Sequence, residues 1–307
     1  MKSALVSGAA GFVGSHLVDQ LLKEGFTVVG VDNFITGNVV NLESAKVNSK
    51  FRFLELDVVD EIPDLETKFD FIFHAASPAS PPKYFEYPIE TMMVNSVGTK
   101  NLIDLSIKCK ARFIFFSTSE VYGDPLEHPQ KENYWGNVNP VGPRSIYDEA
   151  KRFGEALVAQ YVREQKVDAG IIRIFNTYGP RLDPHDGRVV STFIRQAING
   201  EALTINGDGN QTRSFCYISD LIDGILMMAQ SSEFGPINLG NPNEMTLNEL
   251  VVEISKILSK NLKTVNLPEL KDDPVRRKPD ISLAKEKLGW EPKVSLIQGL
   301  QLLINSQ

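Results

Sequence analysis

The sequence is poor in the residues that build disulfide frameworks and metal sites. Only two cysteines, Cys109 and Cys216, occur in 307 residues, and they lie far apart. They therefore predict reduced thiols rather than a disulfide or a cysteine-ligated zinc site. The four histidines are scattered and form no ligand pattern with the cysteines. The sequence thus predicts no metal site.

Long apolar runs and an excess of positive charge are also absent. No stretch reaches the roughly 20 apolar residues that a membrane-spanning helix needs. No charged leader with a long apolar run precedes the first strand pattern, which predicts no signal peptide. The net charge of −7 argues against nucleic acid as a partner. Together these absences predict a cytoplasmic protein that binds neither nucleic acid nor a membrane.

A glycine-rich turn lies near the start of the chain, between a strand pattern and a helix pattern. The apolar run at residues 4–6 is followed by Gly8, Gly11 and Gly14, and then by a helix with one apolar side. Gly8 permits a tight turn, Gly11 lets the backbone approach a pyrophosphate, and Gly14 allows the helix to pack closely on the strand. This arrangement predicts a dinucleotide site.

An acidic residue supports that interpretation. A second strand pattern at residues 27–31 ends in Asp32, eighteen residues after Gly14, where a carboxylate is expected to bond the adenosine ribose. Because a carboxylate repels a 2′-phosphate, Asp32 favours NAD over NADP. The alternative is an ordinary glycine turn with a solvated aspartate.

Further strand patterns recur at the spacing of a doubly wound sheet. They lie at residues 51–56, 69–73, 112–116 and 167–174. We predict an α/β fold: a Rossmann-type doubly wound parallel sheet with a smaller C-terminal substrate-binding lobe. The NAD-binding domain is expected at residues 1–175, with residues 219–240 returning to it, and the lobe at 176–307. The 42% apolar and 23% charged residues fit such an enzyme-like chain.

The ends of these strands carry the candidate ligand-binding residues, because ligands of open α/β sheets bind at the carboxyl ends of the strands. Asp57 and Val58 follow the third strand and suit the edge of an adenine. His74 ends the fourth strand and is expected to be packed rather than catalytic. Thr118 and Glu120 follow the fifth strand and are predicted to face the same way along an extended chain.

Tyr147 and Lys151 are four residues apart in an expected helix, so they lie on one face. A phenol beside a cation suits acid/base chemistry, since the cation favours the phenolate. Such a pair also arises by chance on many helices. With Thr118 it would form a hydroxyl, phenol and ammonium set facing the cofactor.

Two other patterns leave alternatives open. Residues 86–108 are predicted to form a long helix with apolar residues on more than one side, which fits either a subunit interface or burial within the monomer. Arg188, Arg213 and Arg277 lie in loops of the second half. Each alone favours a solvated surface role, whereas a cluster of them would suit a pyrophosphate or carboxylate. Ser219-Asp220 is expected to cap a helix, and Thr246 with Glu249 forms a capping-box pattern.

Several stretches resemble the extended short-chain dehydrogenase/reductase family over essentially the whole chain. They are Gly11–Leu17, Ser77–Pro82, Ser117–Pro125, Tyr134–Arg144, Tyr147–Arg152, Arg173–Arg181, Asp186–Ser191 and Arg276–Asp280. Within the family, Ser77–Pro82 and Tyr134–Pro140 resemble the members that decarboxylate UDP-glucuronate. One departure is Ala9, which stands where these loops usually carry glycine and is expected to crowd the phosphate loop only slightly.

The resemblance implies an NAD cofactor, a UDP-glucuronate substrate and a homodimer joined through the helices near residues 86–108 and Tyr147. The implied cofactor-binding residues are Gly8, Gly11, Phe12, Val13, Gly14, Asp32, Asn33, Thr36, Gly37, Asp57, Val58, Ala75, Tyr147 and Lys151. The implied substrate-binding residues are Thr118, Tyr147, Asn176, Arg188, Arg213, Tyr217 and Arg277.

The implied catalytic residues are Tyr147, Lys151, Thr118, Glu120, Ser119 and Arg277. Glu120 with Ser119 would position the carboxylate or water and help to deliver a proton to C5, and Arg277 would orient the acid end of the sugar. The structural alternative for Glu120 is a buried acid that bonds loop amides and takes no part in catalysis. The rival functions are a nucleotide-sugar 4-epimerase on the same scaffold and a non-catalytic NAD(H)-sensing protein.

Overall fold

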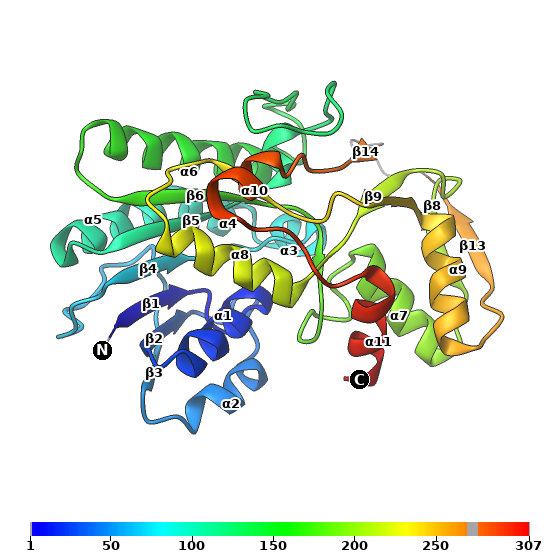
Figure 1. Ribbon diagram of the computed structural model, residues 1–307, viewed down its shortest axis with the longest axis horizontal. Helices are drawn as coiled ribbons and strands as arrows, with labels where there is room; N and C mark the ends of the chain where they lie inside the picture. Colours follow the sequence, from blue (N-terminus) through cyan, green and yellow to red (C-terminus); the bar gives the residue numbers. More distant parts are fainter. Residues whose placement is uncertain (1, 269–275, 307) are drawn as a thin grey trace.

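A seven-stranded parallel sheet forms the centre of the protein in the computed structural model, which describes residues 2–268 and 276–306 (Figure 1). The strand order is β11-β6-β5-β4-β1-β2-β3, and the order reverses between β1 and β4. The strands are β1 (Ser3–Ser7), β2 (Thr27–Asp32), β3 (Phe51–Glu55), β4 (Phe71–His74), β5 (Arg112–Thr118), β6 (Ala169–Ile174) and β11 (Ile237–Leu239). The predicted Rossmann-type fold class is confirmed.

Alternate residues of each strand face opposite layers of helices. Ala4 and Val6 of β1 share one core cluster with α1 (Phe12–Lys23) and α8 (Ile218–Gln230). Leu5, between them, belongs to a second cluster with α5 (Thr99–Cys109) and α6 (Ser145–Arg163). Because both faces of the sheet are covered, its strands are almost continuously apolar.

The helical region before β5 is broken where the sequence pattern predicts one long helix over residues 86–108. The structure has α3 (Pro81–Glu86), a break at Tyr87, α4 (Pro88–Met93), a π-helical turn at Val94–Gly98, and then α5. The break has a local cause, because Pro88 disfavours a helical conformation at Tyr87. Burial within the monomer accounts for Leu102 and Ile103, whereas Met92 and Met93 are exposed, and the alternative of a subunit interface stays a prediction.

The C-terminal lobe is built from short strands and helices beside the carboxyl ends of the main strands (Figure 1). Its main sheet has the order β12-β9-β14. The strands outside the main sheet are β7 (Thr177–Tyr178), β8 (Leu203–Asn206), β9 (Thr212–Ser214), β10 (Cys216–Tyr217), β12 (Glu244–Thr246), β13 (Thr264–Leu267) and β14 (Arg276–Arg277). The later helices are α7 (Val189–Asn199), α9 (Leu247–Leu258), α10 (Ser282–Leu288) and α11 (Leu296–Asn305).

Two predicted helix starts have different outcomes. The capping box of α9 is confirmed, since Thr246 accepts from the Glu249 amide and the Glu249 side chain bonds the Thr246 amide. The predicted cap at Ser219-Asp220 is wrong, because α8 already begins at Ile218. Asp220 instead accepts hydrogen bonds from the amides of Lys293 and Val294, which ties the C-terminal segment to α8.

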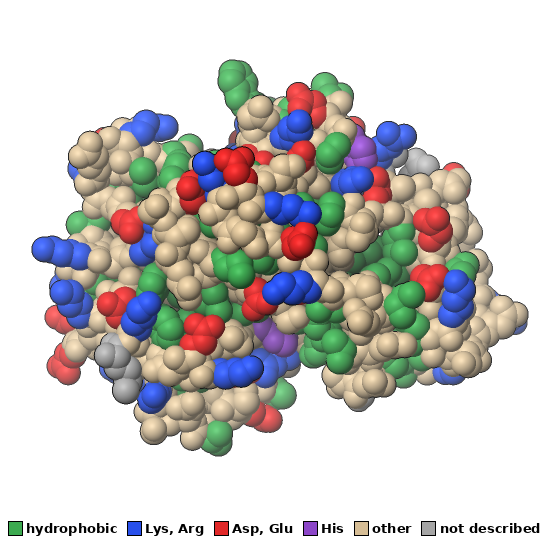
Figure 2. Space-filling view, viewed as in Figure 1, with side chains coloured by type: hydrophobic (Ala, Val, Ile, Leu, Met, Phe, Trp, Pro, Cys, Tyr) green, Lys and Arg blue, Asp and Glu red, His purple; other side chains and the backbone are tan. Residues whose placement is uncertain are grey.

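Lysine, arginine, aspartate and glutamate side chains are interspersed over the face shown in Figure 2. None of the helices in residues 2–268 and 276–306 has the length and apolar character required to cross a membrane.

Candidate active site

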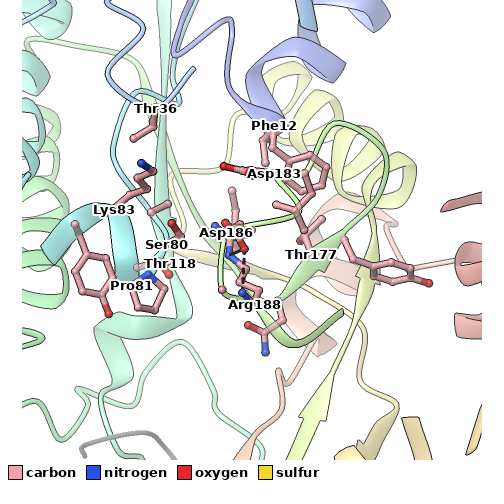
Figure 3. Close-up of a pocket in the computed structure, with 18 of the residues that line it drawn as sticks. Phe12, Thr36, Ser80, Pro81, Lys83, Thr118, Thr177, Asp183, Asp186 and Arg188 are labelled. Atoms are coloured by element: carbon pink, nitrogen blue, oxygen red, sulfur yellow. Dashed lines mark hydrogen bonds and ion pairs between the residues drawn. The ribbon is translucent and has the colours of Figure 1, made fainter. Parts of the chain in front are cut away.

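A cavity of about 940 Å³ lies at the carboxyl ends of the central strands, between the sheet and the smaller lobe. In Figure 3, Ser80, Pro81 and Thr118 lie on one side of it and Thr177 and Arg188 on the other. The expected site residues that line it are Gly8, Gly11, Phe12, Val13, Gly14, Thr36, Gly37, Ala75, Thr118, Ser119, Glu120, Tyr147, Lys151, Asn176, Arg188, Arg213 and Arg277. The fold therefore brings together residues from both halves of the chain.

The glycine loop has no room for side chains where a dinucleotide would approach. Gly8 has a φ of +72°, and a Cβ there would lie 2.7 Å from the Ala76 amide nitrogen. A Cβ on Gly14 would lie 2.0 Å from the Gly8 carbonyl oxygen. Helix α1 begins at Phe12, and Gly11 before it offers no side-chain cap. The first amides of α1 are thus available to an anion, and the loop fits a dinucleotide pyrophosphate.

Replacing Gly14 is expected to weaken NAD binding. In Gly14→Ala the new methyl group meets the Gly8 carbonyl, so the loop must shift, and overpacking of this kind costs about 1–3 kcal/mol. We expect a lower melting temperature and at least about tenfold weaker NAD binding by calorimetry. Gly200→Ala is the control for NAD affinity: no atom lies within 4 Å of its Cβ, and its φ of +74° means that the change should lower the melting temperature while leaving NAD binding unchanged. Unchanged NAD affinity in Gly14→Ala would contradict this account of the loop.

A second cavity, of about 240 Å³, adjoins the glycine loop and is lined by Asp32, Asn33, Asp57 and Val58. The Asp32 carboxylate accepts hydrogen bonds from the amides of Ala10 and Phe34. Burial raises its pKa, and these two hydrogen bonds oppose the shift. The Asn33 amide donates to Asp57 at 2.8 Å. This cavity is therefore built from the residues expected around the adenosine.

Tyr147 and Lys151 lie on the first turns of α6, and both are buried. The Lys151 ammonium donates to the Phe116 carbonyl at 2.8 Å and lies 5.9 Å from the centre of the Tyr147 ring. Burial lowers the pKa of Lys151 to about 7 and raises the pKa of Tyr147 to about 12. The groups that oppose the shift of Tyr147 are Thr118, through a hydrogen bond, and Arg188, through its charge. The expected lowering of this pKa is thus outweighed by burial in the structure.

Tyr84 was not predicted from the sequence, and its ring stacks on that of Tyr147. The two ring centres are 5.3 Å apart and the planes differ by 6°. Tyr84 is buried, and its hydroxyl has no hydrogen-bond partner among the described residues. The sequence signal is its position two residues after the Ser77–Pro82 stretch. Tyr84 covers one face of Tyr147 and confines the phenol to its place in the cavity wall.

Glu120 is held by two arginines from different parts of the chain. Arg277 bonds both carboxylate oxygens, with Nη2 donating to Oε2 at 2.9 Å, and Arg144 donates to Oε2 at 2.5 Å. Burial raises the pKa of Glu120, but the charges of Arg277 and Arg144 more than compensate and hold it below its ordinary value. Glu120 is therefore an ionised acceptor here, which favours a positioning role over the expected proton delivery.

The backbone around Glu120 also differs from the expected extended alternation. Ser119–Tyr122 forms a 3₁₀ turn, and the Thr118 hydroxyl accepts from the Glu120 amide. The turn sends Glu120 toward the two arginines. The alternative of a buried acid bonding loop amides does not describe this site, because two guanidinium groups bond the Glu120 carboxylate.

Arg277 reaches the site because two segments fix its backbone. Strand β14 pairs with β9, opposite Arg213. Buried Gln130, from the connection between β5 and α6, donates its amide to the Lys278 carbonyl and accepts the Lys278 amide on its side-chain oxygen, both at 2.9 Å. Gln130 was not singled out from the sequence, because its role depends on a contact between residues 148 positions apart.

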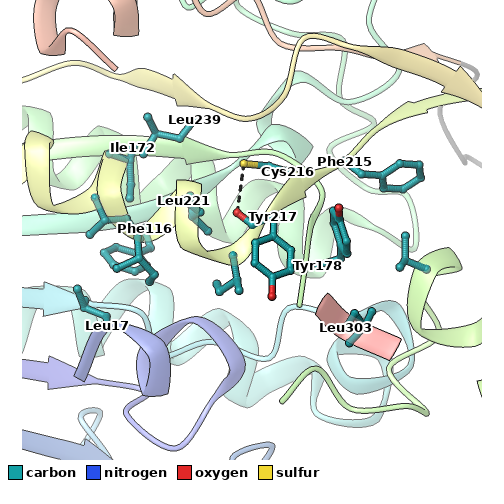
Figure 4. Packing of buried hydrophobic residues seen from close by; sticks show 14 of the residues in the cluster. Leu17, Phe116, Ile172, Tyr178, Phe215, Cys216, Tyr217, Leu221, Leu239 and Leu303 are labelled. Atoms are coloured by element: carbon teal, nitrogen blue, oxygen red, sulfur yellow. Dashed lines mark hydrogen bonds between the residues drawn. The ribbon is translucent and has the colours of Figure 1, made fainter. Parts of the chain in front are cut away.

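The remaining expected substrate residues have different positions. Arg188 is 3.2 Å from the Asp186 carboxylate (Figure 3), and buried Arg213 donates to the Thr212 carbonyl. Tyr217 is the exception, since it lines neither cavity. Its ring packs edge-on against Tyr178 in the core (Figure 4), with ring centres 5.5 Å apart. The expectation that Tyr217 binds substrate is therefore corrected, because core packing takes up its side chain.

Asp148, next to Tyr147, provides a pH-dependent contribution to stability. Burial and the charge of Glu120 raise its pKa to about 7. A raised pKa means that the folded state binds more protons than the unfolded state between about pH 4 and 7, so stability falls as the pH rises through that window. Asp148→Asn is expected to raise the melting temperature more at pH 8 than at pH 5. Exposed Asp60→Asn is the control, and an equal gain at both values would refute the assignment.

Comparison with known proteins agrees with this geometry. The model of the NAD dependent epimerase/dehydratase family matches residues 4–240, and the chain belongs to this family. It is 51% identical over 300 residues to UDP-glucuronic acid decarboxylase 2 of Arabidopsis thaliana, covering 98% of this chain and 67% of that protein. It is 48% identical to UDP-glucuronic acid decarboxylase 1 of Danio rerio, covering 99% and 72%.

Solved structures with the same fold include two nucleotide-sugar epimerases. The UDP-glucuronic acid 4-epimerase of Bacillus cereus, in complex with UDP-glucuronic acid and NAD, is 31% identical, with a TM-score of 0.87 over 99% of this chain and 98% of that one. The UDP-glucose 4-epimerase of Thermotoga maritima is 32% identical, with a TM-score of 0.90 and the same coverage. The scaffold is thus shared by enzymes of different reaction types.

Proposed function

We propose that this protein is an NAD-dependent decarboxylase that converts UDP-glucuronate to UDP-xylose and carbon dioxide. The observation that carries the proposal is the position of Arg277, which reaches across from the smaller lobe to Glu120 in the cavity that Tyr147 also lines. A guanidinium fork there suits the carboxylate of an acidic sugar. The relatives at about half identity support the same reaction.

The cofactor site combines the glycine loop with the adjoining cavity. Gly8, Gly11 and the start of α1 would hold the pyrophosphate, with Asp32 at the adenosine ribose and Lys151 at the nicotinamide ribose. NAD bound there would accept a hydride from C4 of the sugar and return it at the end of the reaction. The other cofactor residues expected from the sequence line the same two cavities.

Tyr147 is the proposed base for the C4 hydroxyl. Thr118 bonds the phenol and lines the same cavity, so it can also bond the substrate oxygen. Since burial raises the pKa of Tyr147 to about 12, the phenol is protonated at neutral pH. It must therefore lose its proton before it can act as a base, and Lys151, whose pKa burial lowers to about 7, would accept that proton in its neutral form. Protonated Lys151 would assist by favouring the phenolate.

Oxidation at C4 makes the sugar a β-keto acid, because its carboxylate is on the neighbouring C5. Such an acid loses carbon dioxide when the bonding electrons move to the ketone oxygen as an enolate. Arg277 would orient the carboxylate, with Glu120 and Ser119 beside it, and Thr118 and Tyr147 would stabilise the enolate oxygen. A water molecule beside Glu120 and Ser119 would then donate a proton to C5, and the hydride would return to C4 with a proton from Tyr147 on the oxygen, giving UDP-xylose with no net redox change.

The UDP part is assigned to residues on the opposite wall of the cavity. Asn176, Arg188 and Arg213 line it, and the two guanidinium groups suit a pyrophosphate. Asp186, 3.2 Å from Arg188, holds that guanidinium near the cavity in the absence of phosphate.

A 4-epimerase is the second candidate, because solved structures of such enzymes share the fold. UDP-glucuronate carrying deuterium at C4 separates the two reactions. We expect UDP-xylose that retains deuterium at C4, since the abstracted label returns to the same carbon. Formation of UDP-galacturonate would favour the epimerase, and UDP-xylose that has lost the label would contradict the oxidation and reduction at C4.

A homodimer and a cytoplasmic location complete the proposal. Met92 of α4 and Phe153 of α6 are exposed apolar side chains on the two adjacent helices expected at the subunit interface. Both cysteines are free and buried, which suits a reducing compartment. Light scattering should give twice the chain mass for the native protein and the chain mass for Met92→Asp/Phe153→Asp. A native monomer would refute the dimer.

A further inference from the structure

The cluster around Glu120 contains more positive charge than one carboxylate needs. Arg277 already supplies a two-pronged contact to both oxygens, yet Arg144 also donates to Oε2 at 2.5 Å. The side chains are 14%, 7% and 16% exposed for Glu120, Arg277 and Arg144, so solvent screens these charges only weakly. Two guanidinium groups around one carboxylate leave a net charge of +1.

The nearby polar groups cancel that charge only in part at neutral pH. Asp148 is 4.0 Å from Arg144, and one of its oxygens is buried without a partner among the described residues. An ionised carboxylate in that setting is costly, and burial with the charge of Glu120 raises the pKa of Asp148 to about 7. The phenols of Tyr84 and Tyr147 also face the cluster, and burial keeps them neutral. The charge of Glu149 adds to the raised pKa of Asp148, but Glu149 itself pairs with Arg152 at 3.5 Å. The remaining positive charge of the cluster therefore favours the binding of one more anion.

We propose that Arg144 is a positioning residue: it retains Glu120 as an oriented, ionised carboxylate when Arg277 turns its N–H groups to the carboxylate of the substrate. This inference rests on the proposed function. If Arg277 were the sole partner of Glu120, its transfer to the substrate would leave the buried Glu120 carboxylate unpaired, which is strongly unfavourable. Arg144, placed just before α6 and bonded to the same oxygen, prevents that loss. Arg144 acts through Glu120 rather than on the substrate.

A double-mutant cycle between Arg144 and Glu120 tests this role. The rate is measured as loss of UDP-glucuronate for the native protein, Arg144→Gln, Glu120→Gln and the double variant. We expect Arg144→Gln to lower kcat about tenfold or more with KM changed by less than about twofold. In the Glu120→Gln background the same change should cost less than about twofold, because a neutral amide needs no second guanidinium. Arg144→Lys, which keeps the charge, should recover part of the kcat.

Arg163→Gln is the matched control, since Arg163 is exposed at the far end of α6 and, among the described residues, bonds Gln160. Melting temperature and NAD retention establish that each variant is folded. If Arg144→Gln does not fold, the cycle is run with Arg144→Met, which also removes the charge but keeps an apolar side chain of similar length. The proposal would be overturned if the kcat losses of the two single variants multiplied in the double variant. A change in KM alone would also overturn it, and either result would indicate that Arg144 binds substrate directly. UDP-galacturonate as product would instead refute the proposed function, while the coupling between Arg144 and Glu120 would still be measured.

Discussion

A Tyr147→Phe variant is expected to lose about 10²- to 10⁴-fold in kcat with UDP-glucuronate, the range typical of removing a general acid or base. The change deletes only the hydroxyl, so the stack on Tyr84 and the burial of the ring are retained. The variant should fold and bind NAD, but absorbance at 340 nm should show no rapid reduction of the cofactor when substrate is added.

Tyr161→Phe is the control, because Tyr161 lies on the same helix and packs, partly buried, against the core away from the cavity. Its kcat should stay within about twofold of the native value. Near-native turnover by Tyr147→Phe would remove the role assigned to the phenol. Turnover by the native protein that falls in Tyr147→Phe, while both forms bind NAD, would also argue against the alternative of a non-catalytic NAD(H)-sensing protein.

Arg277→Gln is expected to block the loss of carbon dioxide more than the oxidation that precedes it. Breaking a buried pair of charges costs about 2 kcal/mol or more, which corresponds to about 30-fold in rate. The release of carbon dioxide should fall by at least that factor. Because Tyr147, Lys151 and Thr118 are untouched, oxidised substrate should accumulate, and a transient rise in absorbance at 340 nm should accompany it.

Arg276→Gln provides a close control for this variant. Arg276 precedes Arg277 on β14, but its side chain is exposed whereas that of Arg277 is buried. Its activity should be unchanged. An Arg277→Gln variant that releases carbon dioxide at the native rate would show that the guanidinium is not needed to orient the carboxylate.

The features that were predicted from the sequence are those set by local patterns. Gly8 and Gly14 mark the phosphate loop because no side chain fits there, and Asp32 marks the end of β2 because a strand pattern precedes it. The capping box of α9 follows from Thr246 and Glu249 alone. Each of these depends on residues close together in the chain, so the pattern contains the needed information.

The features that were missed depend on contacts between distant segments. Tyr84 was not anticipated because it stacks on Tyr147, a residue 63 positions further along the chain on another helix. Gln130 gains its role from Lys278, and Arg144 from a turn that directs Glu120 toward it. The error at Tyr217 has a similar cause: its two-residue strand gives no pattern that distinguishes the core from the cavity. Tertiary packing decided these positions.

The most direct test of the proposed reaction follows the carboxylate carbon. The protein is incubated with NAD and UDP-glucuronate labelled with ¹³C at C6, and the products are observed by NMR without added reductant. The account predicts that the label leaves as carbon dioxide and bicarbonate while unlabelled UDP-xylose forms in equal amount. Label retained in UDP-galacturonate, or in unchanged substrate, would contradict it.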